Sequence, residues 1–266
     1  MPIIRILLLL LLLVNLGHPG AGLAAPEPGA ALENLEYRVS LGLWSEVAQV
    51  HLRLTQVGPN RYRAAFSGAA QGMWRLLSRW LPEGYETDMV LEGGRLKPLV
   101  FREEFQAKGH DIHKEYRFDY SRMVLEVWRG VDHREPVQSW QVPLREPVYD
   151  PLSLFYNLRL GAFGPLKGGQ TLSVAVLPTP EPRELVLRIG PESDGHKIML
   201  EAKGPESKAE GGPYFDICTP QWVPQEAWTR VAVFGKLAGH LLNPAAIRQE
   251  DLLNLSPAPA PTKEAP

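Results

Sequence analysis

Alternation of apolar and polar residues is the feature that most limits what this chain can fold into. In Ala48–Thr55 the even positions are apolar and the odd positions are polar. Neighbouring side chains of a β-strand point to opposite faces, so this pattern predicts a strand with one face in a core and the other in water. The same alternation occurs at 37–43, 62–66 and 112–120, and the turn sequence Gly58-Pro59-Asn60 separates two of these segments.

Further short strands are predicted between turn residues such as Gly93-Gly94. Many short strands at hairpin spacing, with few helices between them, indicate an antiparallel architecture. The expected fold class is mainly β, an antiparallel open barrel or strongly curved sheet with one or two short helices. The additional strands are expected at Met123–Trp128, Thr171–Leu177, Glu184–Ile189, Lys197–Ala202 and Trp228–Phe234.

Two segments have helical rather than strand periodicity. Apolar residues of the first, including Trp74 and Trp80, recur at helical spacing between Met73 and Leu81. This predicts a short amphipathic helix. The favoured interpretation is that it packs on the sheet, and the alternatives are contact with a membrane surface, a lid over a barrel mouth, or a partner surface.

The second helix is predicted to begin after Asp150 and to end at Gly161. Asp150 can cap the first turn, Pro151 suits the first helical position, and Gly161 suits a left-handed exit. Because this segment is apolar on nearly all sides, we expect it to be buried, lying across the sheet.

The start of the chain has the layout of a secretory signal peptide. Arg5 supplies a positive charge, Ile6–Val14 is an unbroken apolar run, and small residues end at Ala24. We expect residues 1–24 to be a signal peptide cleaved after Ala24 and the mature protein to be periplasmic. No cysteine stands at the cleavage site, so a lipoprotein is not expected.

The mature chain is expected to form one folded unit. Residues 25–34 are rich in Pro, Gly and Ala and are interpreted as a linker, 35–243 as a single β-rich domain, and 244–266 as a segment that ends in a disordered Pro/Ala tail. The composition, 44% hydrophobic and 22% charged, is that of a globular protein. One cysteine excludes an internal disulfide.

Several pieces of the sequence together resemble one family. They are the start Leu35–Ser40, Gly94–Leu99, Tyr116–Asp119, the run Asp150–Arg159, and Trp228–Leu237 near the end. They resemble the exported bacterial family called domain of unknown function 3108, and the Asp-Pro-Leu-Ser run is the most specific piece. The resemblance implies an exported, mostly antiparallel β protein in the manner of periplasmic carriers, and it supplies no activity. Trp44-Ser45-Glu46 replaces the family's usual glycine-rich first hairpin, so that turn is expected to differ here.

Ser153, Tyr156 and Arg159 lie three residues apart, so they share one face of the predicted helix. One interpretation is a polar patch that holds a ligand head group, because the guanidinium fork suits a carboxylate or phosphate. The favoured interpretation is structural: Arg159 pairs with a carboxylate and fastens the helix to the sheet, because an unpaired buried charge costs several kcal/mol.

Metal, cofactor and nucleic-acid functions are not expected. His110 and His113 fall on a predicted strand, where residues three apart face opposite sides, and no metal-binding motif accompanies them. No Gly-x-Ser-x-Gly or phosphate-binding loop is present. The net charge of −2, without a basic stripe, argues against nucleic acid.

The expected function is therefore a non-enzymatic binding, carrier or scaffold protein of the cell envelope with an apolar cavity. Its partner would be a hydrophobic small molecule, a lipid or an envelope protein. Two alternatives remain open: an interaction module without a small ligand, and a hydrolase of envelope polymers. The candidate ligand-binding residues are Tyr37, Phe118, Tyr156, Arg159 and Trp228, and the candidate lid or partner residues are Trp74 and Trp80.

Overall fold

The computed structural model describes residues 30–70, 82–107, 109–132, 134–164, 167–177, 183–193, 197–203, 214–218, 223–231 and 235–243. The predicted signal peptide, the predicted helix with Trp74 and Trp80, and the predicted C-terminal tail lie outside these residues. In the described part of the chain, no helix is both long and apolar enough to cross a membrane.

The described strands form one open sheet in the order β8-β7-β6-β5-β4-β3-β2-β1-β15-β14-β13-β12-β11-β10-β9. Every neighbouring pair is antiparallel except β9 and β10. The mainly β, antiparallel fold predicted from alternation is thus confirmed. The strands are β1 (Ala30–Leu41), β2 (Trp44–Gly58), β3 (Arg61–Ala70), β4 (Pro82–Glu92), β5 (Arg95–Ala107), β6 (His110–Asp119), β7 (Val124–Val131), β8 (Val137–Pro143), β9 (Val148–Tyr149), β10 (Thr171–Val176), β11 (Arg183–Ser193), β12 (Lys197–Lys203), β13 (Tyr214–Cys218), β14 (Val223–Val231) and β15 (Gly235–Leu241).

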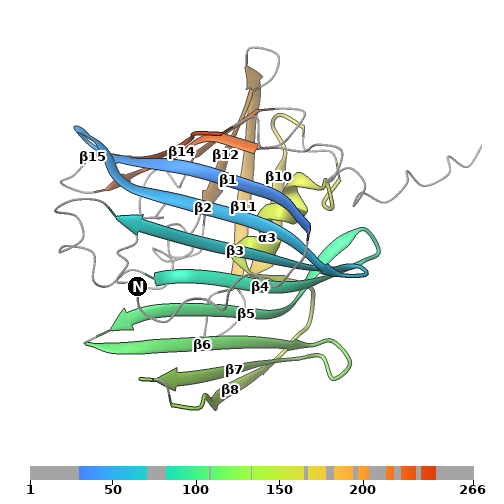
Figure 1. The fold of residues 1–266 in the computed structure, drawn as a ribbon. Coiled ribbons are helices and arrows are strands. Elements are labelled where there is room, and N and C mark those ends of the chain that lie inside the picture. The colour runs from blue at the N-terminus through green and yellow to red at the C-terminus, as the bar shows by residue number, and fades with distance from the viewer. Residues whose placement is uncertain are drawn as a thin grey trace, which may run out of the picture.

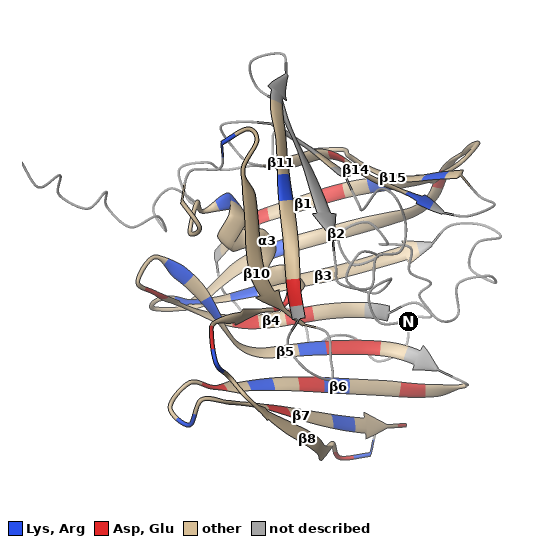
Figure 2. Cartoon of the chain, turned by 180° about the vertical axis from the view of Figure 1, so that it is seen from behind, with Lys and Arg blue, Asp and Glu red and all other residues tan. Residues whose placement is uncertain are grey.

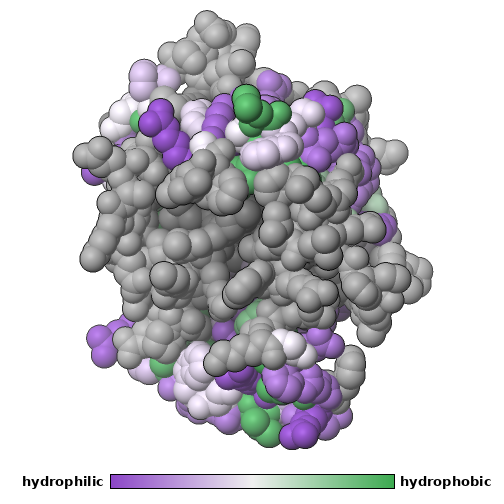
Figure 3. Space-filling model, turned by 90° about the vertical axis from the view of Figure 1, so that its left-hand side faces the viewer, coloured by the Kyte–Doolittle hydropathy of each residue, from purple (hydrophilic) through white to green (hydrophobic). Residues whose placement is uncertain are grey.

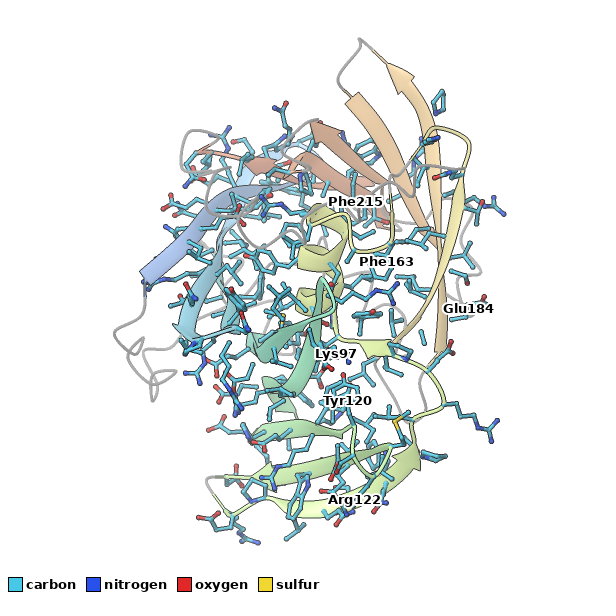
Figure 4. The ribbon with its side chains drawn as sticks, turned by 90° about the vertical axis from the view of Figure 1, so that its right-hand side faces the viewer. Lys97, Tyr120, Arg122, Phe163, Glu184 and Phe215 are labelled. Atoms are coloured by element: carbon cyan, nitrogen blue, oxygen red, sulfur yellow. The ribbon has the colours of Figure 1, made fainter. Side chains whose placement is uncertain are left out.

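The sheet curves around the helix α3 (Pro151–Arg159), which lies against its inner face (Figure 1). α3 packs against β3, β4, β5 and β9. Seen from the side, it lies between the half of the sheet that holds the early strands and the half that holds the late strands (Figure 4).

Alternation explains which side chains face α3. On β1, Leu35, Tyr37, Val39 and Leu41 are buried, whereas the residues between them are exposed or partly exposed. Aromatic rings from four neighbouring strands continue this buried face, with centroids 5.5–5.8 Å apart. The four rings belong to Phe66, Tyr85, Phe101 and Tyr116. The inner face is therefore apolar and aromatic over much of its width.

The outer face of the same strands carries charges of both signs, as Figure 2 shows along β5 and β6. Arg102 on β5 lies 2.9 Å from Glu86 and 2.8 Å from Asp88 on β4. Side chains of opposite charge that face each other across two strands stabilise the pairing of those strands. Each such ion pair contributes little to the stability of the protein when it is partly exposed.

His113 on β6 makes the stability of this outer face depend on pH. Hydrogen bonding to Glu104, and then to Glu115, raises the pKa of His113 from 6.5 to about 9. A histidine whose pKa is higher in the folded state contributes stability that is complete below pH 6.5 and lost as the pH rises through about 9. We expect the free energy of unfolding to fall across this window by about 1 kcal/mol or less, because the imidazole is partly exposed.

Denaturant titrations across this pH window, on the wild type and on His113→Gln, measure this dependence. The variant should have a flatter dependence of stability on pH. If the stability of His113→Gln depends on pH as steeply as that of the wild type, His113 is not the source of the pH dependence.

Two strands begin earlier in the structure than the sequence predicted. β1 begins at Ala30, inside the predicted linker 25–34, because its first residues pair with β2 opposite Gln56 and Thr55. β14 begins at Val223, before the predicted start at Trp228, and is described as far as Val231, so the predicted end at Phe234 lies outside the described residues.

The first hairpin does contain a glycine, although Trp44-Ser45-Glu46 suggested a different turn. Gly42 turns the chain with a φ of 57°, and its N–H donates to the carbonyl of Lys236 at 2.8 Å. Leu43 is fully exposed and Trp44 is 47% exposed beside it. Figure 3 looks at the left-hand side of the molecule in Figure 1 and shows small hydrophobic areas among hydrophilic ones on its described surface.

Candidate ligand site on the inner face

The start of α3 is fixed by a buried carboxylate. Asp150 Oδ1 accepts from the backbone N–H groups of Leu152 at 2.9 Å and Ser153 at 3.1 Å, which is an N-cap, as predicted from the sequence. Thr87 on β4 donates its hydroxyl to the same oxygen at 2.7 Å. Burial raises the pKa of Asp150, and these donors oppose that rise. The cap therefore also fastens the helix to the sheet.

The middle of α3 is fixed by Asn157. Its Oδ1 accepts from the N–H of Leu96 at 2.9 Å, and its Nδ2 donates to the carbonyl of Leu96 at 2.7 Å. β5 pairs with β6 only from Val100 onward, and Leu96 lies on β5 before that point. The amide of Asn157 therefore takes the place of a neighbouring strand for a buried part of β5.

Both sides of α3 are buried in apolar surroundings. Leu152 and Tyr156 belong to the hydrophobic cluster of the early strands, and Leu154 belongs to the cluster of the late strands with Phe215. Gly161 follows the helix with a φ of 67°, as its position predicted. The expectation of a buried helix lying across the sheet is thus confirmed.

The end of α3 carries a buried ion pair. The Nη1 atom of Arg159 donates to Oε2 of Glu33 on β1. The side chain of Arg159 is 3% exposed and that of Glu33 is fully buried. The charge partner that we expected for Arg159 is therefore present, and it ties the helix to the sheet.

A bulge brings Glu33 to this position. Ala31 pairs with Thr55 and Glu33 pairs with Leu54, so Leu32 is an extra residue in β1. From Glu33 onward the strand alternates regularly, and Glu33 falls on the same buried face as Leu35 and Tyr37.

Two tyrosines complete this group, which we call the Glu33–Arg159 cluster: Glu33, Tyr37, Tyr156 and Arg159. Burial raises the pKa of Tyr156 well above its usual value, the nearby Glu33 carboxylate raises it further, and Arg159 opposes the rise. Burial likewise raises the pKa of Tyr37, whose hydroxyl donates to the carbonyl of Pro224 on β14 at 3.0 Å. Both tyrosines are therefore neutral at physiological pH.

Several polar atoms of the cluster are buried without a hydrogen-bond partner among the described residues. They are Oε1 of Glu33, the hydroxyl of Tyr156, and Nε and Nη2 of Arg159. Buried polar atoms are nearly always satisfied in native proteins, because an unsatisfied one costs about 1–3 kcal/mol. This group therefore has hydrogen-bonding capacity for a further polar molecule.

The structure brings together three of the five predicted ligand-binding residues: Tyr37, Tyr156 and Arg159. Phe118 is buried on β6, where its ring stacks on Tyr120 at 6.2 Å. Trp228 is partly buried on β14, where it packs against the hydrophobic cluster of the late strands and has Lys236 Nζ 4.9 Å from its ring centroid. Phe118 and Trp228 do not belong to the Glu33–Arg159 cluster.

The sequence analysis did not identify two residues that hold α3 against the sheet, Glu33 and Asn157. Glu33 was assigned to the linker, although the alternation of Leu35, Tyr37 and Val39, extended two residues back, puts it on the buried face. Asn157 stood inside the run that carries the family resemblance, but no sequence signal shows its partner on β5.

A second set of aromatic and basic side chains lies beside α3 in the view of Figure 4. Lys97 Nζ is 5.7 Å from the ring of Tyr120 and forms an ion pair with Glu92 at 2.7 Å. Phe163 meets Tyr149 edge to face at 5.3 Å. These residues have partners among the described side chains, so they add packing around the helix.

Among the described residues, no group of three or more His, Cys, Asp or Glu side chains is arranged to hold a metal ion. His110 and His113 bind separate partners: His110 lies 2.6 Å from Asp132, and His113 lies 3.5 Å from Glu104.

The described residues define a class of protein by their fold and site: a mainly antiparallel, open and curved sheet that encloses the helix α3 and a buried ion pair. The model of the family described as "Protein of unknown function (DUF3108)" matches residues 36–189, more than half of the chain. The chain belongs to this family, as the sequence resemblance suggested.

Comparison with solved structures gives a match to a "Beta-barrel-like Protein of Domain of Unknown Function DUF1849 from Brucella abortus". The TM-score is 0.43 at 8% sequence identity, over 80% of this chain and 97% of the other. A comparison with curated proteins gives no match.

Proposed function

We propose that this protein is exported to the periplasm and acts there as a non-enzymatic carrier that holds a hydrophobic molecule against the inner face of its sheet. The observation that carries the proposal is the combination of an apolar, aromatic inner face with buried polar atoms that have no partner at one place on it. Ligand sites for lipids and similar molecules combine these two features, a largely apolar wall and a few convergent polar groups.

The leader-like start of the sequence supports export, and the neutral tyrosines of the cluster support a binding role rather than acid–base chemistry. A carrier also needs an element that can separate ligand from water. α3 lies where such an element would be needed, between the two halves of the sheet (Figure 4).

Uptake by the purified mature protein tests the proposal. We expect a fluorescent fatty acyl probe to bind saturably, and protein purified from the periplasm to release a lipid on organic extraction, identified by mass spectrometry. A bovine serum albumin sample of equal concentration calibrates the probe, and heat-unfolded protein measures non-specific adsorption. A clean extract together with no saturable uptake would reject the carrier function.

A further inference from the structure

The unpartnered atoms of the Glu33–Arg159 cluster specify what kind of head group would fit there. Nε and Nη2 of Arg159 can only donate, and Oε1 of the Glu33 carboxylate, which pairs with that arginine, accepts. The hydroxyl of Tyr156 can do either. A molecule that satisfies this set must accept from Arg159 and donate to Glu33 at the same time.

The charges of the cluster also limit which head groups can bind there. Glu33 and Arg159 are within hydrogen-bond contact and almost fully buried, so their charges compensate each other within the cluster. A second anion would meet the Glu33 carboxylate at close range, and a second cation would meet Arg159. Either would be a net charge in a buried place, which is costly unless it is paired.

The surroundings of the cluster supply the apolar part of a site. The guanidinium carbon of Arg159 lies 5.4 Å from the ring centroid of Phe155 and 5.8 Å from that of Tyr156. Leu35, two residues after Glu33 on the same face, is completely buried. If the polar head of a ligand lies at the cluster, the alkyl chain attached to that head would therefore contact apolar side chains.

From these observations we infer that the cluster binds the head of an uncharged amphiphile, a hydroxyl or primary amide group that both donates and accepts hydrogen bonds on an apolar chain. The inference rests on the proposed carrier function and narrows it. It replaces the carboxylate or phosphate head that the isolated Arg159 suggested from the sequence, because Glu33 already neutralises that guanidinium.

Three amphiphiles with the same alkyl chain test this head-group preference: monolaurin, laurate and dodecylamine. We measure each by displacement of the fluorescent probe from the mature protein near neutral pH, below the critical micelle concentrations. The wild type should bind monolaurin about tenfold more tightly than either charged ligand, which corresponds to about 1.4 kcal/mol.

A charge-changing variant makes the test sharper. Glu33→Gln keeps the size of the side chain but leaves the charge of Arg159 uncompensated, so the preference should shift to laurate. Laurate should also raise the melting temperature of this variant, because a ligand that binds only the folded state stabilises it. This thermal readout remains usable if the variant is less stable than the wild type.

Glu103→Gln is the matched control. Glu103 is also a buried carboxylate, with a neighbouring Tyr116 hydroxyl at 3.2 Å, but it lies on β5 outside the cluster. We expect it to retain the preference of the wild type for monolaurin.

The outcomes separate the inference from the function on which it rests. Equal binding of all three ligands, or a preference that Glu33→Gln leaves unchanged, overturns the neutral head-group site and leaves the carrier function standing. Ordinary buried water would then be the partner of these atoms. If none of the three ligands displaces a probe that does bind, the inference is likewise overturned and the carrier function stands. If the probe itself shows no saturable binding and no lipid is extracted, the carrier function is rejected and the inference with it.

Discussion

Glu33→Met is expected to lower the free energy of unfolding by about 3–5 kcal/mol, because it leaves a buried arginine without its carboxylate. Arg159 is 3% exposed, so bulk solvent does not reach the guanidinium that has lost its carboxylate. Urea unfolding followed by circular dichroism measures the change. The slope with denaturant should stay close to the wild-type value if the variant still unfolds as one unit.

The double variant Glu33→Met with Arg159→Met separates the ion pair from simple packing. Replacing both partners by apolar groups of similar volume is often neutral or even stabilising, so we expect it to recover most of the lost stability. Lys97→Met is the exposed control, since its pair with Glu92 should contribute no more than about 1 kcal/mol. A single variant that costs as little as this control would show that the buried pair does not hold α3.

Asn157→Leu is expected to cost about 2–5 kcal/mol. The substitution keeps the approximate shape of the side chain but leaves both the N–H and the carbonyl of Leu96 without a partner in a buried place. Each such group costs about 1–3 kcal/mol. The same urea experiment measures the loss.

Asn34→Leu serves as the matched control for this substitution, because Asn34 is exposed on β1. We expect its stability to lie within about 0.5 kcal/mol of the wild type. Equal effects of the two substitutions would contradict the role of Asn157 as a substitute for a strand.

The sequence predicted the strands and α3 because the signals for both are local. Alternation over a few residues identifies a strand wherever one face is buried, as in Ala48–Thr55. Asp150, Pro151 and Gly161 mark the ends of α3 by chemistry that acts within one helical turn.

The cluster could not be predicted in the same way, because its parts are far apart in the sequence. Glu33 and Arg159 are separated by 126 residues, and they meet only because the sheet curves around α3. A single-residue bulge at Leu32 also decides which face Glu33 occupies. The need of Arg159 for a carboxylate was predictable from the cost of a buried charge, but the identity of that carboxylate was not.

Trp228 shows a further limit of prediction from composition. It is partly buried, as its aromatic character suggested, and it packs against the hydrophobic cluster of the late strands rather than at the Glu33–Arg159 cluster. Which of two buried clusters such a side chain joins depends on how distant strands pair, and no local pattern in the sequence specifies that pairing.

The location of a bound amphiphile tests the central claim most directly. A lauroyl glycerol analogue with a diazirine on its alkyl chain is bound to the mature protein and activated by light, and the labelled peptides are identified by mass spectrometry. Our account predicts labels on β1 and α3, which excess monolaurin suppresses. Labels confined to outer-face peptides, or labels that excess monolaurin does not reduce, would contradict it.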